Sequence, residues 1–219
     1  MNLRLNIQLL LIAKAPVPGR VKTRLCPPCT PQQAAGLAAA ALADTLETLT
    51  AAPATHRTLL LSGERFPLPA GWRCVPQRGD GLGARLANGF ADTAAPGVAS
   101  VLVGMDTPQL TAGLLAFAAT LLGSFDVDAV LGHAADGGWW GLGLRDPAAA
   151  DVLRDVPMST AETGARTEAA LLGRGLRVAR LPRLRDVDTW PDALAAAETA
   201  PNSRFAAALA DIAVLRADR

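Results

Sequence analysis

The feature that most constrains the fold is a repeated alternation of short apolar runs with longer stretches of helical pattern. The apolar runs have the length of β-strands and lie at residues 5–13, 57–61, 72–76, 99–104, 126–133, 139–144 and 176–181. Helical patterns lie at residues 31–50, 81–93, 107–122 and 164–172, and an alanine-rich tail from residue 191 predicts two helices broken at Pro201. This alternation predicts an α/β protein with a largely parallel sheet.

Length and composition favour one domain that binds a small partner. With 219 residues, half of them apolar, the chain can bury a full core. We expect one domain over residues 1–219, with a core at about 5–195 and a helical tail at 191–219. A net charge of +1 and nine aromatic residues argue against a nucleic-acid partner. No segment is long and apolar enough to span a membrane, and homo-oligomerisation is left open.

Cysteine usage and the N-terminus both bear on location. Three cysteines, Cys26, Cys29 and Cys74, are too few and too unevenly spaced for a disulfide framework, and this indicates a reducing compartment. The first 15 residues have the outline of a signal peptide, but Asn6 and Gln8 interrupt its apolar part and cleavage would remove the first strand. We therefore expect a cytoplasmic protein.

A cation-rich loop, KAPVPGRVKTRL at residues 14–25, follows the first strand. It holds four cations and no acid, and both lysines of the chain, Lys14 and Lys22, lie in it. The first acid of the whole chain is Asp44, so an anion should bind to the N-terminal part. Because the loop lacks the glycine and lysine spacing of a Walker motif, we expect a phosphate-binding loop of another kind.

Acidic residues follow several of the later strands, at Asp80, Asp106, Asp136 and the pair Asp186 and Asp188. In a parallel sheet the loops that follow the strands share one edge, so these carboxylates should converge with the cations of the first loop. Carboxylates set apart bind a hard divalent cation such as Mg²⁺ or Mn²⁺, which bridges phosphate oxygens. The pattern predicts a site for a nucleotide and a metal.

Structural interpretations compete with this functional one. Thr107 and Pro108 predict the start of a helix, so Asp106 could cap that helix instead of binding a metal. The segment DVD at residues 186–188 could be a solvated turn, and the glycines beside Asp80 and Asp136 could be turn formers. The residues alone leave these alternatives open.

Four motifs together resemble a known family. In chain order they are KAPVPGRVKTRL, GMDTPQL, DGGWWGLGL and MSTAETGARTEAALLGRGLRVARLPRLRDVDTW. The set resembles an uncharacterised bacterial family of glycosyltransferase-A-type proteins, which is similar to molybdenum-cofactor and phospholactate guanylyltransferases. The resemblance implies a nucleotide-diphospho-sugar transferase fold, a three-layer α/β/α domain with a mixed, mostly parallel sheet. It also implies a divalent metal, Mg²⁺ or Mn²⁺.

The resemblance implies a role for each matched residue. Nucleotide would contact Ala13, Lys14, Pro18, Gly19, Arg20, Lys22, Arg24, Asp80 and Gly83. The acceptor would contact Gly137, Gly138 and Trp139. The metal would be held by Asp106 together with Asp188 and Asp186. The catalytic residues would be Lys22, Asp106 and Asp136.

The chain departs from the family pattern at two places. The family usually has Asp-Leu-Gly in the third loop, whereas this chain has Gly81-Leu82-Gly83 with Asp80 one place earlier. Trp139 stands where the family usually has tyrosine. We expect a metal-dependent enzyme that takes a nucleoside triphosphate or nucleotide sugar and transfers the glycosyl group to a small acceptor. Nucleotidyl transfer with release of pyrophosphate, and nucleotide binding without catalysis, are the alternatives.

Overall fold

The computed structural model describes residues 6–64 and 66–217, so Leu5, the expected start of the first strand, lies outside the described residues. The strands are β1 (Asn6–Lys14), β2 (His56–Ser62), β3 (Trp72–Pro76), β4 (Val98–Gly104), β5 (Ala129–Ala134), β6 (Trp139–Leu144) and β7 (Val178–Leu184). The α-helices are α1 (Pro31–Ala51), α2 (Gly81–Thr93), α3 (Ala112–Gly123), α4 (Thr163–Gly173), α5 (Trp190–Thr199) and α6 (Arg204–Ala217). Two 3₁₀ helices are η1 (Thr23–Leu25) and η2 (Pro147–Asp155).

The strands form one mixed, mostly parallel sheet in the order β3-β2-β1-β4-β6-β5-β7. β6 pairs antiparallel with both β4 and β5, and the other pairings are parallel. Because β6 alone runs in reverse, the carboxyl ends of the other six strands lie at the same edge of the sheet. The expected α/β class and mixed sheet are confirmed.

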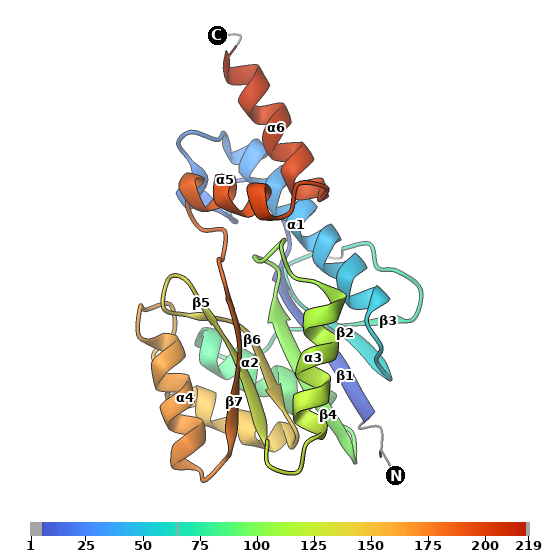
Figure 1. Cartoon of the computed structure of the whole chain (residues 1–219). Coiled ribbons are helices and arrows are strands. Elements are labelled where there is room, and N and C mark those ends of the chain that lie inside the picture. Colours follow the sequence, from blue (N-terminus) through green and yellow to red (C-terminus); the bar gives the residue numbers. More distant parts are fainter. Residues whose placement is uncertain (1–5, 65, 218–219) are drawn as a thin grey trace.

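Helices cover both faces of the sheet, which gives three layers (Figure 1). On one face the sheet packs against α1 and α3, through residues such as Leu42 and Leu115. On the other face it packs against α2, η2 and α4, through Phe90, Leu153 and Leu171. The central strand β4 is buried along almost its whole length, as its continuous apolar run predicts.

A third apolar cluster lies beyond the edge of the sheet where the strands end. There α5 and α6 pack on α1, as the upper part of Figure 1 shows. Leu25, from the end of the cation-rich loop, is fully buried in this cluster, and so is Val187, from the segment after β7. The cluster therefore anchors two loops that are far apart in the sequence.

The helix expected at residues 107–122 begins later than predicted. Pro108 lies in a turn, closed by a hydrogen bond from Leu110 N to the carbonyl oxygen of Thr107 (3.0 Å). Thr111 caps α3, because its side chain accepts a hydrogen bond from Leu114 N (3.2 Å). The expectation that Asp106 adjoins a helix N-terminus is therefore wrong, and Asp106 does not cap α3.

Two other boundaries differ for physical reasons. The last strand extends past Pro182, which a strand at the edge of a sheet tolerates because the missing N–H need not pair. The 3₁₀ helix η2 was not predicted, and it begins where Asp146 accepts a hydrogen bond from Ala148 N (3.0 Å). No helix in the part of the chain that the structure describes combines the length and the apolar character needed to cross a membrane.

Candidate active site

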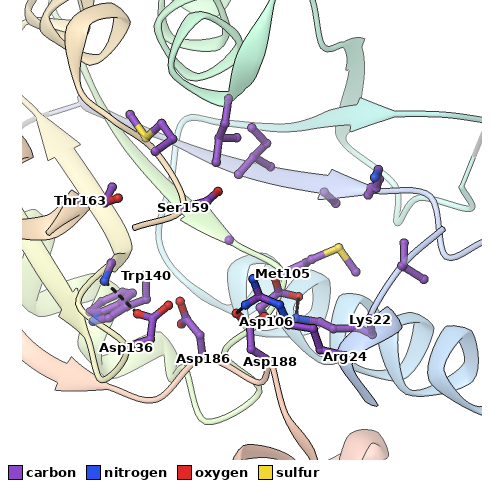
Figure 2. Close-up of a pocket in the computed structure, with 18 of the residues that line it drawn as sticks. Lys22, Arg24, Met105, Asp106, Asp136, Trp140, Ser159, Thr163, Asp186 and Asp188 are labelled. Carbon is purple, nitrogen blue, oxygen red and sulfur yellow. Dashed lines mark hydrogen bonds and ion pairs between the residues drawn. The ribbon is translucent and has the colours of Figure 1, made fainter. Parts of the chain in front are cut away.

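A cavity of about 780 Å³ lies at the edge of the sheet where the six parallel strands end. Its walls come from the cation-rich loop, from the segments after β3, β4, β5 and β7, from the first turns of α2, and from the segment between η2 and α4. Figure 2 shows the carboxylates of Asp136, Asp186, Asp188 and Asp106 in a row, with Lys22 and Arg24 at one end of it. The topology thus brings cations and carboxylates to one place, as the strand-end positions predict.

Most of the expected site residues line this cavity. Those that line it are Ala13, Lys14, Arg20, Lys22, Arg24, Asp106, Asp136, Gly138, Trp139, Asp186 and Asp188. Those outside its lining are Pro18, Gly19, Asp80, Gly83 and Gly137. The structure therefore gathers the cations and four of the five carboxylates, while Asp80 and Gly83 of the third loop lie apart.

Lys22 is the centre of an ion-pair network. Its ammonium lies 2.7 Å from Asp106 Oδ1 and 3.4 Å from Asp188 Oδ1, and it also donates to the carbonyl oxygen of Val187. Its side chain is only 10% exposed. Burial by itself would lower the pKa of Lys22, but the nearby carboxylates, Asp106 above all, raise it above its ordinary value. Lys22 is therefore a buried, charged ammonium.

The segments that carry the carboxylates are held together by the backbone. Val187 N donates to the carbonyl oxygen of Asp106 (2.9 Å), which joins the loop after β4 to the segment after β7. Because Val187 is buried in the third apolar cluster, Asp186 and Asp188 on either side of it remain at the cavity. The DVD segment is therefore not a solvated turn.

The carboxylate of Asp186 is buried close to other negative charges. Its Oδ1 is buried and has no hydrogen-bond partner. Burial, followed by the charges of Asp106 and Asp136, raises the pKa of Asp186 to about 7. The positive charge of Lys22 lowers the pKa of Asp186 but offsets only part of this rise. An additional positive charge near Asp186 would relieve this cost.

The opposite wall is built from two interlocked loops. Gly137 has a φ of +93°, and Gly164 N donates to its carbonyl oxygen (2.8 Å). A Cβ on Gly164 would lie 2.5 Å from the carbonyl oxygen of Gly138, so glycine is required for this close approach. Asp136 accepts a hydrogen bond from Gly138 N (2.8 Å), which holds its carboxylate at the turn. Gly137 thus shapes this wall without lining the cavity.

Asp80 and Gly83 of the third loop lie outside the cavity lining, although Leu82 between them lines it. A Cβ on Gly83 would come within 2.3 Å of the carbonyl oxygen of Leu153, so this glycine allows α2 to pack closely on η2. Asp80 is exposed and precedes α2 without capping it through its side chain. The geometry accounts for Gly83 by helix packing and brings neither residue to the row of carboxylates.

Several lining residues were not singled out from the sequence. Gln77 follows β3, and its side-chain amide donates to the carbonyl oxygens of Ala13 (2.8 Å) and Leu60 (2.9 Å). Hydroxyl groups of Ser159 and Thr160 lie in the segment that joins η2 to α4, and the hydroxyl group of Thr163 lies at the first residue of α4. The position of Gln77 directly after a strand could have indicated that it lies at the site. No such pattern marks the three hydroxyl residues, because they lie at the start of a helix and not after a strand.

Comparison with solved structures shows where this architecture occurs. A protein from Desulfovibrio desulfuricans G20, called a "putative nucleotide-diphospho-sugar transferase", superposes with a TM-score of 0.82 and is 27% identical over 95% of both chains. Rv0371C of Mycobacterium tuberculosis H37Rv, solved in complex with manganese, has a TM-score of 0.54 and 21% identity over 88% of this chain and 99% of that one. No curated protein matches the sequence.

A third neighbour is 2-C-methyl-D-erythritol 4-phosphate cytidylyltransferase from Thermus thermophilus, with a TM-score of 0.54 and 15% identity over 89% of this chain and 98% of that one. At such identities the likeness shows the fold. The fold and the site at its strand ends define a transferase enzyme of the nucleotide-diphospho-sugar transferase class. Within that class, the chain belongs to the bacterial family DUF2064, described as "uncharacterized protein conserved in bacteria", which matches residues 33–160.

The carboxylates can be tested for their fit to a divalent cation. Oxygen ligands suit Mg²⁺ or Mn²⁺, and the unpartnered Asp186 Oδ1 lies where a cation would satisfy it. Among the residues that the structure describes, however, no group of three or more His, Cys, Asp or Glu is arranged to hold a metal ion. The carboxylate oxygens are therefore ligands of the right kind for Mg²⁺ or Mn²⁺, but the Lys22 ammonium already contacts those of Asp106 and Asp188.

Proposed function

We propose that this protein is a metal-dependent transferase that binds a nucleotide or nucleotide sugar in the cavity and transfers the glycosyl group to a small acceptor. The observation that carries the proposal is the row of carboxylates that ends at the buried ammonium of Lys22. A site that combines cations with carboxylates suits a substrate that brings both phosphate and a divalent cation. The fold of the neighbouring structures supports the same class.

The nucleotide would occupy the half of the cavity formed by the cation-rich loop. Lys14, Arg20 and Arg24 line this half and are exposed, so their charges are available to phosphate oxygens. Asp106 and Asp188, with Asp186, would hold Mg²⁺ or Mn²⁺. When bound, the metal would supply a Lewis acid that neutralises charge on the leaving phosphate. Lys22 would add a second positive charge at the phosphate.

The acceptor would occupy the other half, beside the wall formed by the Asp136 turn. This half is lined by carboxylates and by the hydroxyl groups of Ser159, Thr160 and Thr163. These groups can form hydrogen bonds with the hydroxyl groups of a sugar or polyol. Asp136 would accept the proton of the attacking hydroxyl, since its carboxylate lines the cavity. Trp139 lies against this half, and its indole N–H donates to Thr167 Oγ1 (3.2 Å).

Nucleotidyl transfer is the second candidate, because the cytidylyltransferase neighbour has the same fold. Both reactions need phosphate-binding cations and a metal, but they differ in the bond that breaks. Glycosyl transfer cleaves the bond from sugar carbon to diphosphate oxygen and releases a nucleoside diphosphate. Nucleotidyl transfer cleaves between the α- and β-phosphates of a triphosphate and releases pyrophosphate. Binding without turnover would release neither.

One panel of incubations separates these functions. The protein is mixed with each nucleoside triphosphate and with UDP- and GDP-sugars, with and without Mn²⁺, in the presence of sugars and polyols as acceptors. Released nucleoside diphosphate that depends on acceptor would support glycosyl transfer, and released pyrophosphate would support the second candidate. If no nucleotide raises the melting temperature at saturating concentration, the nucleotide site itself is wrong.

A further inference from the structure

The Lys22 ammonium occupies the position between Asp106 and Asp188 that a bound metal ion would need. The ammonium contacts Asp106 Oδ1 (2.7 Å), Asp188 Oδ1 (3.4 Å) and the carbonyl oxygen of Val187. The ammonium therefore bridges the loop after β4 and the segment after β7. Arg24 makes a weaker contact from outside, with Nη1 3.3 Å from Asp188 Oδ2 and a side chain that is 72% exposed.

An ammonium and a divalent cation cannot share this position. Mg²⁺ binds its oxygen ligands at about 2.0–2.1 Å. A metal held by Asp106 and Asp188 would need the carboxylate groups that the Lys22 ammonium now contacts. It would be within repulsive contact of Nζ, and two cations so close would also repel one another. One of them must leave.

We infer that Lys22 is an exchangeable internal cation, which holds the Asp106 and Asp188 carboxylates together in the metal-free protein and is expelled from between them when a divalent cation binds. This inference rests on the proposed metal site and adds how that site is filled and emptied. It makes Lys22 a positioning residue in the metal-free state and a phosphate ligand afterwards.

The backbone at Lys22 is suited to such an exchange. Lys22 has a φ of +48° and a ψ of 36°, a left-handed conformation that is unfavourable for a residue with a side chain. Leu25, three residues on, is anchored in the third apolar cluster, so a rotation at Lys22 can move the ammonium without moving η1. The expelled ammonium would need an anion, and the phosphates of a nucleotide are the anions that this half of the cavity suits. Metal and nucleotide should therefore bind with positive cooperativity.

The composition of the chain offers a direct test on the wild-type protein. Lys14 and Lys22 are its only lysines, and Lys14 is exposed. Reductive methylation with formaldehyde, followed by peptide mass spectrometry, measures the reactivity of Lys22 with Lys14 as internal reference. Without metal, Lys22 should react much more slowly than Lys14, and Mg²⁺ alone should raise the ratio at least about fivefold. An unchanged ratio at a Mg²⁺ concentration that saturates the site would overturn the inference.

A second test measures affinity for Mn²⁺ alone, by electron paramagnetic resonance of the free ion. Lys22→Met removes the competing ammonium, so it should bind Mn²⁺ about tenfold more tightly than wild type. Arg73→Met is the matched control and should leave the affinity unchanged, because Arg73 is exposed on β3 and lies outside the cavity lining. Equal or weaker binding by Lys22→Met would overturn the inference. If neither the variants nor the wild type bind Mn²⁺, both the inference and the proposed metal site are wrong. The panel of nucleotide incubations tests the proposed function separately.

Discussion

The carbonyl oxygen of Ala161 lies 2.0 Å from the position that a Cβ on Gly137 would occupy. This contact joins the turn after β5 to the segment before α4, and so builds the wall beside Asp136. Gly137 also has a φ of +93°, which L side chains rarely adopt. We expect Gly137→Ala to lower the free energy of unfolding by about 2 kcal/mol or more and to weaken acceptor-dependent turnover. Urea denaturation and a turnover assay would measure both.

Gly36→Ala is the matched control for this substitution. Gly36 lies in α1, is exposed, and has no atom within 4 Å of the position that a Cβ would take. Alanine favours a helix over glycine, so this variant should be more stable by up to about 1 kcal/mol. A Gly137→Ala protein as stable as the parent would contradict the interlocked wall.

Asp106 tests the metal site. We expect Asp106→Asn to weaken Mn²⁺ binding at least about tenfold, because an amide oxygen is a far poorer ligand for a hard cation than a carboxylate. Metal-dependent binding of nucleotide should be lost with it, while the far-UV circular dichroism stays unchanged. Asp80→Asn is the control, since Asp80 lies outside the cavity lining, and it should bind Mn²⁺ like the parent. Equal losses in both variants would indicate a general charge effect and refute a specific role for Asp106.

Asp186 should make the stability of the metal-free protein depend on pH. Its pKa is raised from 3.8 to about 7, first by burial and then by Asp106 and Asp136. Between these two values the folded protein retains a proton that the unfolded chain has released, so this group lowers the free energy of unfolding as pH rises from about 4 to about 7. Asp186→Asn cannot ionise and escapes that loss.

We therefore expect Asp186→Asn to be more stable than the parent by on the order of 2 kcal/mol at pH about 8, and by little at pH about 4, in the presence of EDTA. Thermal unfolding at a series of pH values measures the difference. Asp211→Asn, at an exposed position of α6, should show no such trend. A difference that stays flat or shrinks as the pH rises would show that Asp186 is not a buried carboxylate of raised pKa.

Gln77 connects the end of β1 to the nucleotide half of the cavity. Its amide donates to the carbonyl oxygens of Ala13 and Leu60, and Gln77→Leu would remove both hydrogen bonds. We expect a loss of stability of about 1–2 kcal/mol and weaker binding of nucleotide, because Lys14 follows Ala13 directly. Gln32→Leu, exposed in the first turn of α1, should leave nucleotide affinity unchanged. Calorimetric titration of both variants would check this, and similar affinities would exclude Gln77 from the site.

Much of the fold follows from patterns that are local in the sequence. The strand at residues 72–76 and the helix at 81–93 have the predicted boundaries, because apolar runs and helical periodicity extend over neighbouring residues. The start of α3 did not follow, since Thr107-Pro108 predicts a helix start at that point, whereas in the packed chain this segment forms a turn and Thr111 caps the helix. The roles of Asp80 and Gly83 as nucleotide contacts remain predictions that their positions do not favour, because the close packing of α2 on η2 was not visible in the sequence.

The sequence by itself determined that cations follow the first strand and that carboxylates follow later ones, since the end of a strand is a local property. The tertiary structure decided which of these groups meet. Lys22 and Asp188 are 166 residues apart in the sequence. They meet because β1 and β7 end at the same edge of the sheet, and because Leu25 and Val187 beside them are buried in the third apolar cluster. Periodicity carries no information about such pairing, because it depends on packing between distant segments. The same packing placed Lys22 between the carboxylates, where the sequence predicts only a phosphate ligand.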